Sequence, residues 1–279
     1  MTLNFSKMQG CGNDYIYFNC FKQEIKSPAE LSIKLSNRHY GIGGDGIILI
    51  CPSKIADAKM RIFNSDGSEA KMCGNGIRCV GKYLYDNRIV KSEIIKIETL
   101  SGIKTLQILK TENNVTNLKV SMGKAELNPK NIPVKIDKEK VINESVLLGN
   151  KYYNINCISI GNPHCVIFCD DLENLDIENE GPLFENSPLF PDRVNVEFIK
   201  LTDKNTIEMR VWERGSGETM ACGTGACAAA VAIVENGYCE KGKDIKVKLK
   251  GGDLLINYTN EAVYMTGNAE KIYEGVVKI

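Results

Sequence analysis

The chain has 279 residues, 43% of them hydrophobic and 25% charged, and its 35 basic residues balance 35 acidic ones. This length exceeds a usual single domain and predicts two domains. Proteins that bind nucleic acids or acidic membranes usually carry an excess of basic residues, whereas this chain has a net charge of zero, so we expect neither partner. The longest small-and-apolar run, residues 226–234, is too short to span a membrane, and the N-terminus lacks a signal-peptide layout. We therefore expect a cytoplasmic protein.

The expected elements are short strands and a few helices. In chain order they are a helix over 28–39, strands over 47–50 and 58–63, a helix over 74–86, strands over 94–97 and 117–121, a helix over 223–236, and strands over 244–249 and 254–258. Several strands alternate apolar and polar residues, which is typical of antiparallel sheets with one buried face. The third helix is small or apolar on every side, so we expect it to be buried all round. The pattern favours an α+β fold over a doubly wound parallel sheet.

The eleven cysteines are expected to be reduced thiols, because no export signal accompanies them. The chain has no Cys-x-x-Cys pair and only two histidines, His39 and His164, so the usual spacing of zinc ligands is missing. We expect neither a metal site nor a disulfide framework. Taken singly, most cysteines are small buried hydrophobes, and this interpretation is applied to all of them except Cys73 and Cys222.

An internal repeat runs through the sequence. Gly12-Asn13 recurs as Gly161-Asn162, and the Cys-Gly-x-Gly motif at Cys73 recurs at Cys222, both at an offset of 149 residues (222 − 73). Two motifs that share one offset indicate a gene duplication, with pseudo-symmetric halves near 1–130 and 150–279.

Each repeated cysteine stands at the start of an expected helix. The glycines that follow it let the backbone expose successive N–H groups, which favours an anion at the helix N-terminus. The same dipole lowers the pKa of a thiol and so favours the reactive thiolate. Two equivalent thiols beside two anion sites could invert a stereocentre without a cofactor, since one removes a proton from one face while the other supplies a proton to the opposite face.

Seven motifs, in order, make the chain resemble the diaminopimelate epimerase family. They lie at residues 12–15, 61–68, 72–79, 161–164, 194–197, 212–215 and 221–226. The resemblance implies two domains, each of antiparallel β-sheets wrapped barrel-like around a central helix, with the active site in the cleft between them. It places the first domain at 1–121, completed by a last strand at 268–279, and the second at 122–267.

The resemblance also implies the function and the site residues. It implies an isomerase of lysine and cell-wall precursor biosynthesis that interconverts LL- and meso-diaminopimelate without a cofactor, with Cys73 and Cys222 as acid/base pair. The implied substrate-binding residues are Asn13, Asn64, Gly74, Asn75, Asn162, Asn195, Glu213, Arg214, Gly223 and Thr224. His164 and Glu213 are expected to set the thiol pKa values, and Tyr273 is expected near a homodimer interface. Where the family often has glutamine, this chain has Gly46, which is therefore left out of the site.

Three other interpretations are weighed against this one. Residues 41–46 satisfy the dinucleotide-binding pattern G-x-G-x-x-G, but a helix precedes the glycines and a strand follows them, which is the reverse of the required order. A proline racemase-type enzyme shares the two cysteines but typically has histidine where this chain has Asn75. The alternative from another class is a thiol-redox or metal-binding protein that uses Cys73 and Cys222.

Overall fold

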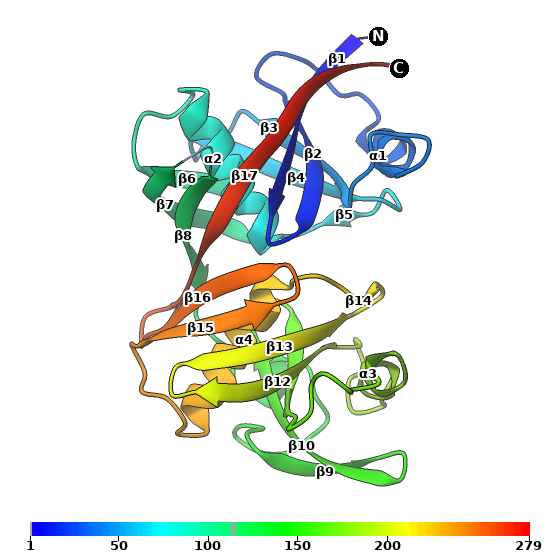
Figure 1. The fold of residues 1–279 in the computed structure, drawn as a ribbon, viewed down its shortest axis with the longest axis vertical. Coiled ribbons are helices and arrows are strands. Elements are labelled where there is room, and N and C mark those ends of the chain that lie inside the picture. Colours follow the sequence, from blue (N-terminus) through cyan, green and yellow to red (C-terminus); the bar gives the residue numbers. More distant parts are fainter. Residues whose placement is uncertain (1, 113–114) are drawn as a thin grey trace. The chain divides into compact units, whose positions relative to one another are not determined.

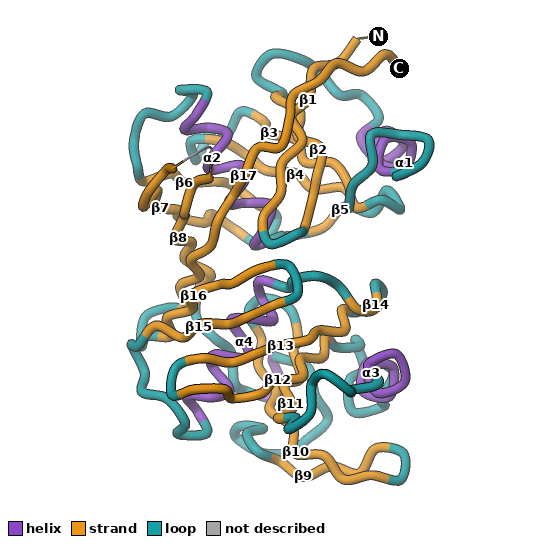
Figure 2. Tube along the Cα trace, in the orientation of Figure 1, coloured by secondary structure: helices purple, strands orange, loops and turns teal. Residues whose placement is uncertain are grey.

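The computed structural model describes residues 2–112 and 115–279, which divide into two compact units. Unit 1 comprises Met1–Ser121 and Thr266–Ile279, and unit 2 comprises Met122–Met265. Strands dominate both units (Figure 2). Across the described part of the chain, no helix is long and apolar enough to cross a membrane.

Unit 1 is built from a continuous series of strands and two α-helices (Figure 1). Its elements are β1 (Thr2–Gly10), β2 (Asn13–Asn19), α1 (Pro28–Ser36), β3 (Gly46–Cys51), β4 (Ala58–Asn64), β5 (Glu69–Ala70), α2 (Gly74–Asp86), β6 (Ile94–Thr99), β7 (Gly102–Glu112) and β8 (Val115–Gly123). The last strand of the chain, β17 (Val263–Lys278), begins in unit 2 and ends in unit 1, where it pairs antiparallel with β1.

Unit 2 repeats this order. Its elements are the 3₁₀ turn η1 (Pro129–Asn131), β9 (Glu144–Leu148), β10 (Lys151–Ser159), β11 (Pro163–Phe168), α3 (Ile177–Glu185), β12 (Asn195–Asp203), β13 (Thr206–Glu213), β14 (Gly217–Glu218), α4 (Gly223–Glu235), β15 (Asp244–Leu249) and β16 (Gly252–Tyr258). An offset of 149 residues carries β1 onto β10, α1 onto α3 and α2 onto α4, each with identical bounds (151 − 2, 177 − 28 and 223 − 74).

A helix lies at the centre of each unit. In unit 1, α2 packs against β1, β2, β6 and β7, and in unit 2, α4 packs against β10, β11, β12, β15 and β16. Burial of α4 follows from its composition, because alanine, valine and isoleucine leave no polar face. In α2 two buried cationic side chains have hydrogen-bond or ion-pair partners instead. Lys82 reaches Thr116 at 3.1 Å and Asp86 at 2.7 Å, and Arg78 donates to the carbonyl of Asn268 at 3.0 Å.

The second helix of each unit packs on the opposite side of the strands. The contacts of α1 are with β3 and β4, and those of α3 are with β12, β13 and β14. Leu31 and Leu35 of α1 join Ile16, Phe18 and further residues of β1, β3 and β4 in one apolar cluster. Phe184 of α3 joins the corresponding cluster of unit 2.

The expected α+β class with two pseudo-symmetric halves is confirmed, with three differences in detail. Helix α1 ends at Ser36, three residues before the expected end, because Asn37 takes an extended ψ of 122°. Helix α3 was not expected. Most strand pairs are antiparallel, but β2–β3, β4–β6, β11–β12 and β13–β15 are parallel. Each parallel pair is joined by a connection that carries a helix or a short strand.

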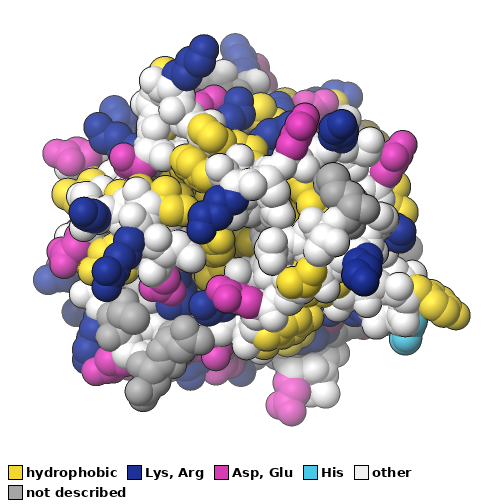
Figure 3. All heavy atoms as spheres, turned by 90° about the horizontal axis from the view of Figure 1, so that it is seen from above, with side chains coloured by type: hydrophobic (Ala, Val, Ile, Leu, Met, Phe, Trp, Pro, Cys, Tyr) yellow, Lys and Arg dark blue, Asp and Glu magenta, His cyan; other side chains and the backbone are white. Residues whose placement is uncertain are grey.

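The charges are mixed on the face shown in Figure 3. Lys and Arg side chains alternate there with Asp and Glu side chains, and hydrophobic side chains lie between them. This face therefore has no patch of a single sign.

Candidate active site

Cys73 is the N-cap residue of α2. Its backbone is extended (φ −139°, ψ 116°), and its sulfur accepts a hydrogen bond from the backbone N–H of Gly76 at 3.3 Å. The thiol donates to Oδ1 of Asn13 at 3.3 Å. The side chain is partly exposed. The helix N-terminus and the asparagine therefore hold the sulfur in one place.

Cys222 occupies the same position on α4. Its backbone is extended (φ −115°, ψ 112°), its sulfur accepts from the N–H of Gly225 at 3.4 Å, and Thr224 Oγ1 lies 3.4 Å from the sulfur. Unlike Cys73, Cys222 is buried. The predicted equivalence of the two cysteines thus extends to their backbone and their capping bond.

The second glycine of each Cys-Gly-x-Gly motif is required by close packing. A Cβ atom at Gly76 would lie 2.6 Å from Cδ1 of Ile48, and a Cβ atom at Gly225 would lie 2.5 Å from Oε1 of Glu197. With any other residue there, the side chain of Ile48 or Glu197 would have to move. The packing also explains why both motifs keep this glycine.

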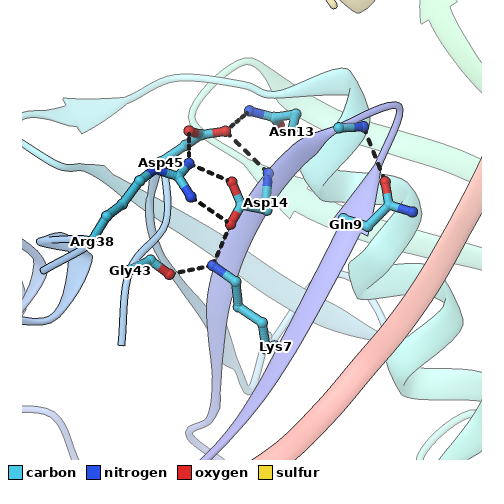
Figure 4. A network of polar contacts seen from close by, with 8 residues as sticks. Lys7, Gln9, Asn13, Asp14, Arg38, Gly43 and Asp45 are labelled. Atoms are coloured by element: carbon cyan, nitrogen blue, oxygen red, sulfur yellow. Dashed lines mark hydrogen bonds and ion pairs between the residues drawn. The ribbon is translucent and has the colours of Figure 1, made fainter. Parts of the chain in front are cut away.

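In unit 1 a network of ion pairs holds Asn13 (Figure 4). The amide nitrogen of Asn13 donates to Oδ2 of Asp45 at 2.7 Å, which leaves Oδ1 for the Cys73 thiol. Arg38 bridges two carboxylates, at 2.7 Å from Asp14 and 3.0 Å from Asp45. Lys7 is buried, lies 2.5 Å from Asp14 and donates to the carbonyl of Gly43.

The pKa values of the two carboxyl groups in this network shift in opposite directions. Burial acts to raise the pKa of Asp14, but hydrogen bonds from Arg38 and Lys7 outweigh burial and lower it. The pKa of Asp45 is raised by burial and by the negative charge of Asp14. Among the described residues, Arg38 is the only side chain that bonds to both carboxylates, so it keeps Asp45 in position to orient the Asn13 amide.

Unit 2 holds the equivalent Asn162 with different residues. Nδ2 of Asn162 donates to Thr224 at 3.3 Å, and Oδ1 faces Nε2 of His164 at 3.1 Å. Nδ1 of His164 lies 2.7 Å from Oε1 of Glu197, and both side chains are fully buried. Because Oδ1 of an amide can only accept, Nε2 of His164 is the donor in the bond to Asn162.

Two carboxyl groups set the electrostatics around Cys222. Burial raises the pKa of the Cys222 thiol well above its ordinary value, and the negative charges of Glu213 and Glu197 raise it further. Glu213 accepts hydrogen bonds from Cys222 and, at 2.5 Å, from Thr219, while its own pKa is raised by burial. This surrounding favours a protonated thiol at Cys222.

The remaining expected site residues lie at the ends of neighbouring elements. Asn64 ends β4 and bonds to Tyr15 and Ser68, and Asn75 is buried in the first turn of α2. Asn195 begins β12, accepts from the N–H of Arg214 at 3.0 Å and donates to the carbonyl of Pro163 at 3.0 Å. The exposed guanidinium of Arg214 donates to the carbonyl of Asp192 at 2.7 Å.

Neither Tyr273 nor Gly46 contributes a side chain to the residues described above around Cys73 and Cys222. Tyr273 pairs with Lys7 in the β1–β17 ladder and packs edge-on against Phe5, with ring centroids 5.9 Å apart. At Gly46, a Cβ atom would lie 2.1 Å from the carbonyl oxygen of Phe63, so no side chain fits on this backbone. The site of unit 1 is therefore built without a side chain at that position.

Three residues next to the site were not expected from the sequence. Glu197 supports His164, and Arg38 with Asp45 supports Asn13. The signal for Glu197 was its place in the motif 194–197, two residues after Asn195 on the same strand, where successive odd positions share one face. Arg38 and Asp45 carried no such signal, because they lie in the irregular connection between α1 and β3.

Two stretches of the chain, residues 5–128 and 156–272, match the family model described as diaminopimelate epimerase. The chain belongs to the diaminopimelate epimerase family. Among relatives with that name, the protein of Acetivibrio thermocellus is 51% identical over 279 residues and covers 99% of each chain. The protein of Methanococcus maripaludis is 50% identical and covers 99% of this chain and all of the relative.

Solved structures with the same fold are far more distant in sequence. A hydroxyproline epimerase from Agrobacterium vitis, determined with bound trans-4-hydroxy-L-proline, has a TM-score of 0.71 at 13% identity and covers 99% of this chain and 92% of that one. A phenazine biosynthesis protein of the PhzF family from Bacillus anthracis has a TM-score of 0.71 at 17% identity and covers both chains fully. At these identities the likeness shows the fold alone.

Proposed function

We propose that this chain is an isomerase that interconverts LL- and meso-diaminopimelate, with Cys73 and Cys222 as its two acid/base groups. Membership of the family and full-length relatives of that name support the reaction. The observation that carries the mechanism is the equivalence of the two thiols. Each caps a buried helix through an N–H···S bond, and no other cysteine is such a cap.

The proposed chemistry needs only these two groups. A thiolate removes the proton from the α-carbon, and the other thiol delivers a proton to the opposite face, so the configuration inverts. The charge that develops on the α-carboxylate is stabilised by the first N–H groups of the two helices, at Gly74, Asn75, Gly223 and Thr224.

The surroundings of the thiols support different roles in the free protein. Cys222 has two carboxyl groups near it and a pKa that burial raises, so it holds its proton. Cys73 donates its thiol proton to Oδ1 of Asn13, and its sulfur accepts from the N–H of Gly76, a bond that also stabilises the thiolate once that proton has left. We therefore propose Cys73 as the group that first removes a proton and Cys222 as the group that first donates one.

We assign recognition of the distal end of the substrate to Arg214, Glu213 and the amides of Asn64, Asn162 and Asn195. A guanidinium has five N–H donors, and one of those of Arg214 bonds to the Asp192 carbonyl, which leaves a fork for a carboxylate. Glu213 can accept from the distal ammonium. A site with these polar groups discriminates against amino acids that lack the distal charges, because the groups would then be left unpaired.

The substitution Arg214→Lys tests this recognition. Lysine keeps the charge but loses the two-pronged geometry, so kcat/KM for diaminopimelate should fall by roughly 1.5–3 kcal/mol of transition-state stabilisation. The assay follows epimerisation of LL-diaminopimelate, meso-diaminopimelate, lysine and proline by the wild type and the variant. Wild-type turnover of lysine equal to that of diaminopimelate would show that no distal recognition exists. Turnover of proline would favour the racemase alternative instead.

We further propose a cytoplasmic homodimer in which Tyr273 lies near the interface. No disulfide joins any of the eleven cysteines, all of which lie in the described part of the chain, and reduced thiols are typical of a reducing compartment. The exposed apolar side chains Ile272, Tyr273 and Val276 lie close together on β17, and Ile279 follows them. Exposed apolar side chains such as these are common at protein interfaces. Within the described residues, no group of three or more His, Cys, Asp or Glu side chains is placed to hold a metal ion.

A further inference from the structure

A second pair of cysteines meets at the edge of unit 1, apart from the residues of the site. Cys20 follows β2 and Cys51 ends β3, and these strands are parallel neighbours with Asn19 opposite Ile50. Cys20 therefore comes beside Cys51, and its N–H extends the ladder to the carbonyl of Ile50 at 2.9 Å. Both side chains pack against the same apolar cluster, so they share one face of the sheet. The Cys20 thiol donates to the carbonyl of Phe18 at 3.8 Å, and each of the two thiols shifts the pKa of the other.

The backbone geometry suits a covalent link. Neighbouring strands lie about 4.7–4.9 Å apart, and a disulfide needs Cα atoms about 4.4–6.8 Å apart with side chains on the same side. Both thiols are also partly exposed. A small oxidant can therefore reach them in the folded protein.

Positive charges flank the pair. Lys59 is opposite Cys51 in the β3–β4 ladder, and Arg61 lies two residues further along β4. The neighbouring Cys20 thiol and these two cations lower the pKa of Cys51, although burial opposes them, and the neighbouring Cys51 thiol together with burial raises the pKa of Cys20. Glu69 and Glu98 neutralise part of the cationic charge, at 2.7 Å from Arg61 and 3.0 Å from Lys59.

A buried pair in unit 2 shows what distinguishes this one. Cys157 and Cys165 are directly opposite each other in the β10–β11 ladder, but both are fully buried. Burial raises the pKa of Cys165 well above its ordinary value, so it stays a thiol. The two cysteines lie close together in both pairs. Of these two pairs, only Cys20 and Cys51 are partly exposed to solvent and have neighbouring cations.

We propose that Cys20 and Cys51 form a redox-sensitive dithiol, which a peroxide converts into an intramolecular disulfide. The Cys51 thiolate attacks the peroxide, the O–O bond breaks, and sulfenic acid and hydroxide form. The sulfur of Cys20 then attacks the Cys51 sulfur, the S–O bond breaks and water leaves. Overall, two thiols lose two electrons and two protons, and one hydrogen peroxide becomes two waters. The link ties β2, which begins at Asn13, to β3, which follows Asp45.

Peptide mapping of the full-length protein tests the proposal. The background is Cys73→Ala/Cys222→Ala, so that the thiols of the site cannot contribute. The protein is treated with hydrogen peroxide, free thiols are alkylated in urea, and a protease that cleaves after aromatic residues separates Cys11 from Cys20. We expect a Cys20–Cys51 linked peptide as the main crosslink, its loss after reduction with dithiothreitol, and alkylated Cys157 and Cys165.

The controls decide whether the native fold causes the link. Oxidation in denaturing urea should give mixed linkages with little of the Cys20–Cys51 product, because the strands no longer hold the sulfurs together. Cys51→Ser should abolish the linked peptide, whereas Cys169→Ser, at another partly exposed cysteine, should leave its yield unchanged. The proposal is overturned if Cys20 and Cys51 are recovered separately as alkylated thiols or sulfinic acids, or if the native yield does not exceed the yield in urea.

Discussion

The two cysteine sites share a backbone geometry but differ in charge. Cys73 lies beside a neutral amide, and Cys222 lies beside Glu213 and near Glu197. A buried anion next to a thiol disfavours the thiolate, so these carboxyl groups keep the proton on Cys222. The 149-residue offset matches Glu213 with Asn64 (213 − 64), but the sequence alone does not show that Glu213 lies beside the Cys222 thiol, because that contact depends on the fold.

The substitution Glu213→Gln tests this electrostatic role. Removal of the negative charge should lower the pKa of Cys222, because its thiolate no longer faces a neighbouring anion, while Gln can still accept from Thr219. Alkylation of Cys222 by iodoacetamide in a Cys73→Ala background should then be several-fold faster at neutral pH. The measurement is the pH dependence of this rate by mass spectrometry. Glu218→Gln is the control, since Glu218 pairs with Arg210 and Lys250. An unchanged pH profile in Glu213→Gln would refute the assignment.

At the scale of elements, much of the architecture could be predicted from the sequence. The two central helices were expected from their Cys-Gly-x-Gly starts, and the 149-residue offset relates α2 to α4 without an insertion. The same offset carries α1 onto α3, so α3 was predictable from the repeat although its own sequence contains Pro182. Its apolar pattern alone was too weak to indicate a helix. Parallel strand pairs stayed unpredicted because pairing direction depends on contacts far apart in the chain.

The connection between α1 and β3 supports the site of unit 1 through Arg38. In Arg38→Ala, Asp14 and Asp45 lose their shared cation, and Asp45 no longer holds the Asn13 amide toward Cys73. We expect kcat to fall about tenfold with a smaller change in KM, as for a lost charge-assisted hydrogen bond. The control Arg61→Ala removes an ion pair to Glu69 in the same unit and should leave kcat unchanged. Equal kinetic effects of both substitutions would show that Arg38 acts only on stability.

We expect two copies of the chain to form a homodimer, with the end of β17 near the interface. The substitution Tyr273→Ala removes an exposed ring that packs against Phe5, so it should weaken the interface and shift the mass by light scattering toward the monomer. The control is Tyr152→Ala, which removes an exposed tyrosine of unit 2. A wild type that is monomeric at all concentrations measured would contradict the expected dimer.

The central claim is that two thiols act on opposite faces of one carbon. Epimerisation of LL-diaminopimelate in deuterium oxide tests it most directly. With two bases, the meso product should carry solvent deuterium at the inverted carbon from the first turnover, while unreacted substrate keeps its protium. Cys73→Ala and Cys222→Ala should each reduce epimerisation by about 10³-fold or more, and Cys169→Ala should not. A product that retains the substrate's protium, or either active-site variant with near wild-type turnover, would contradict the account.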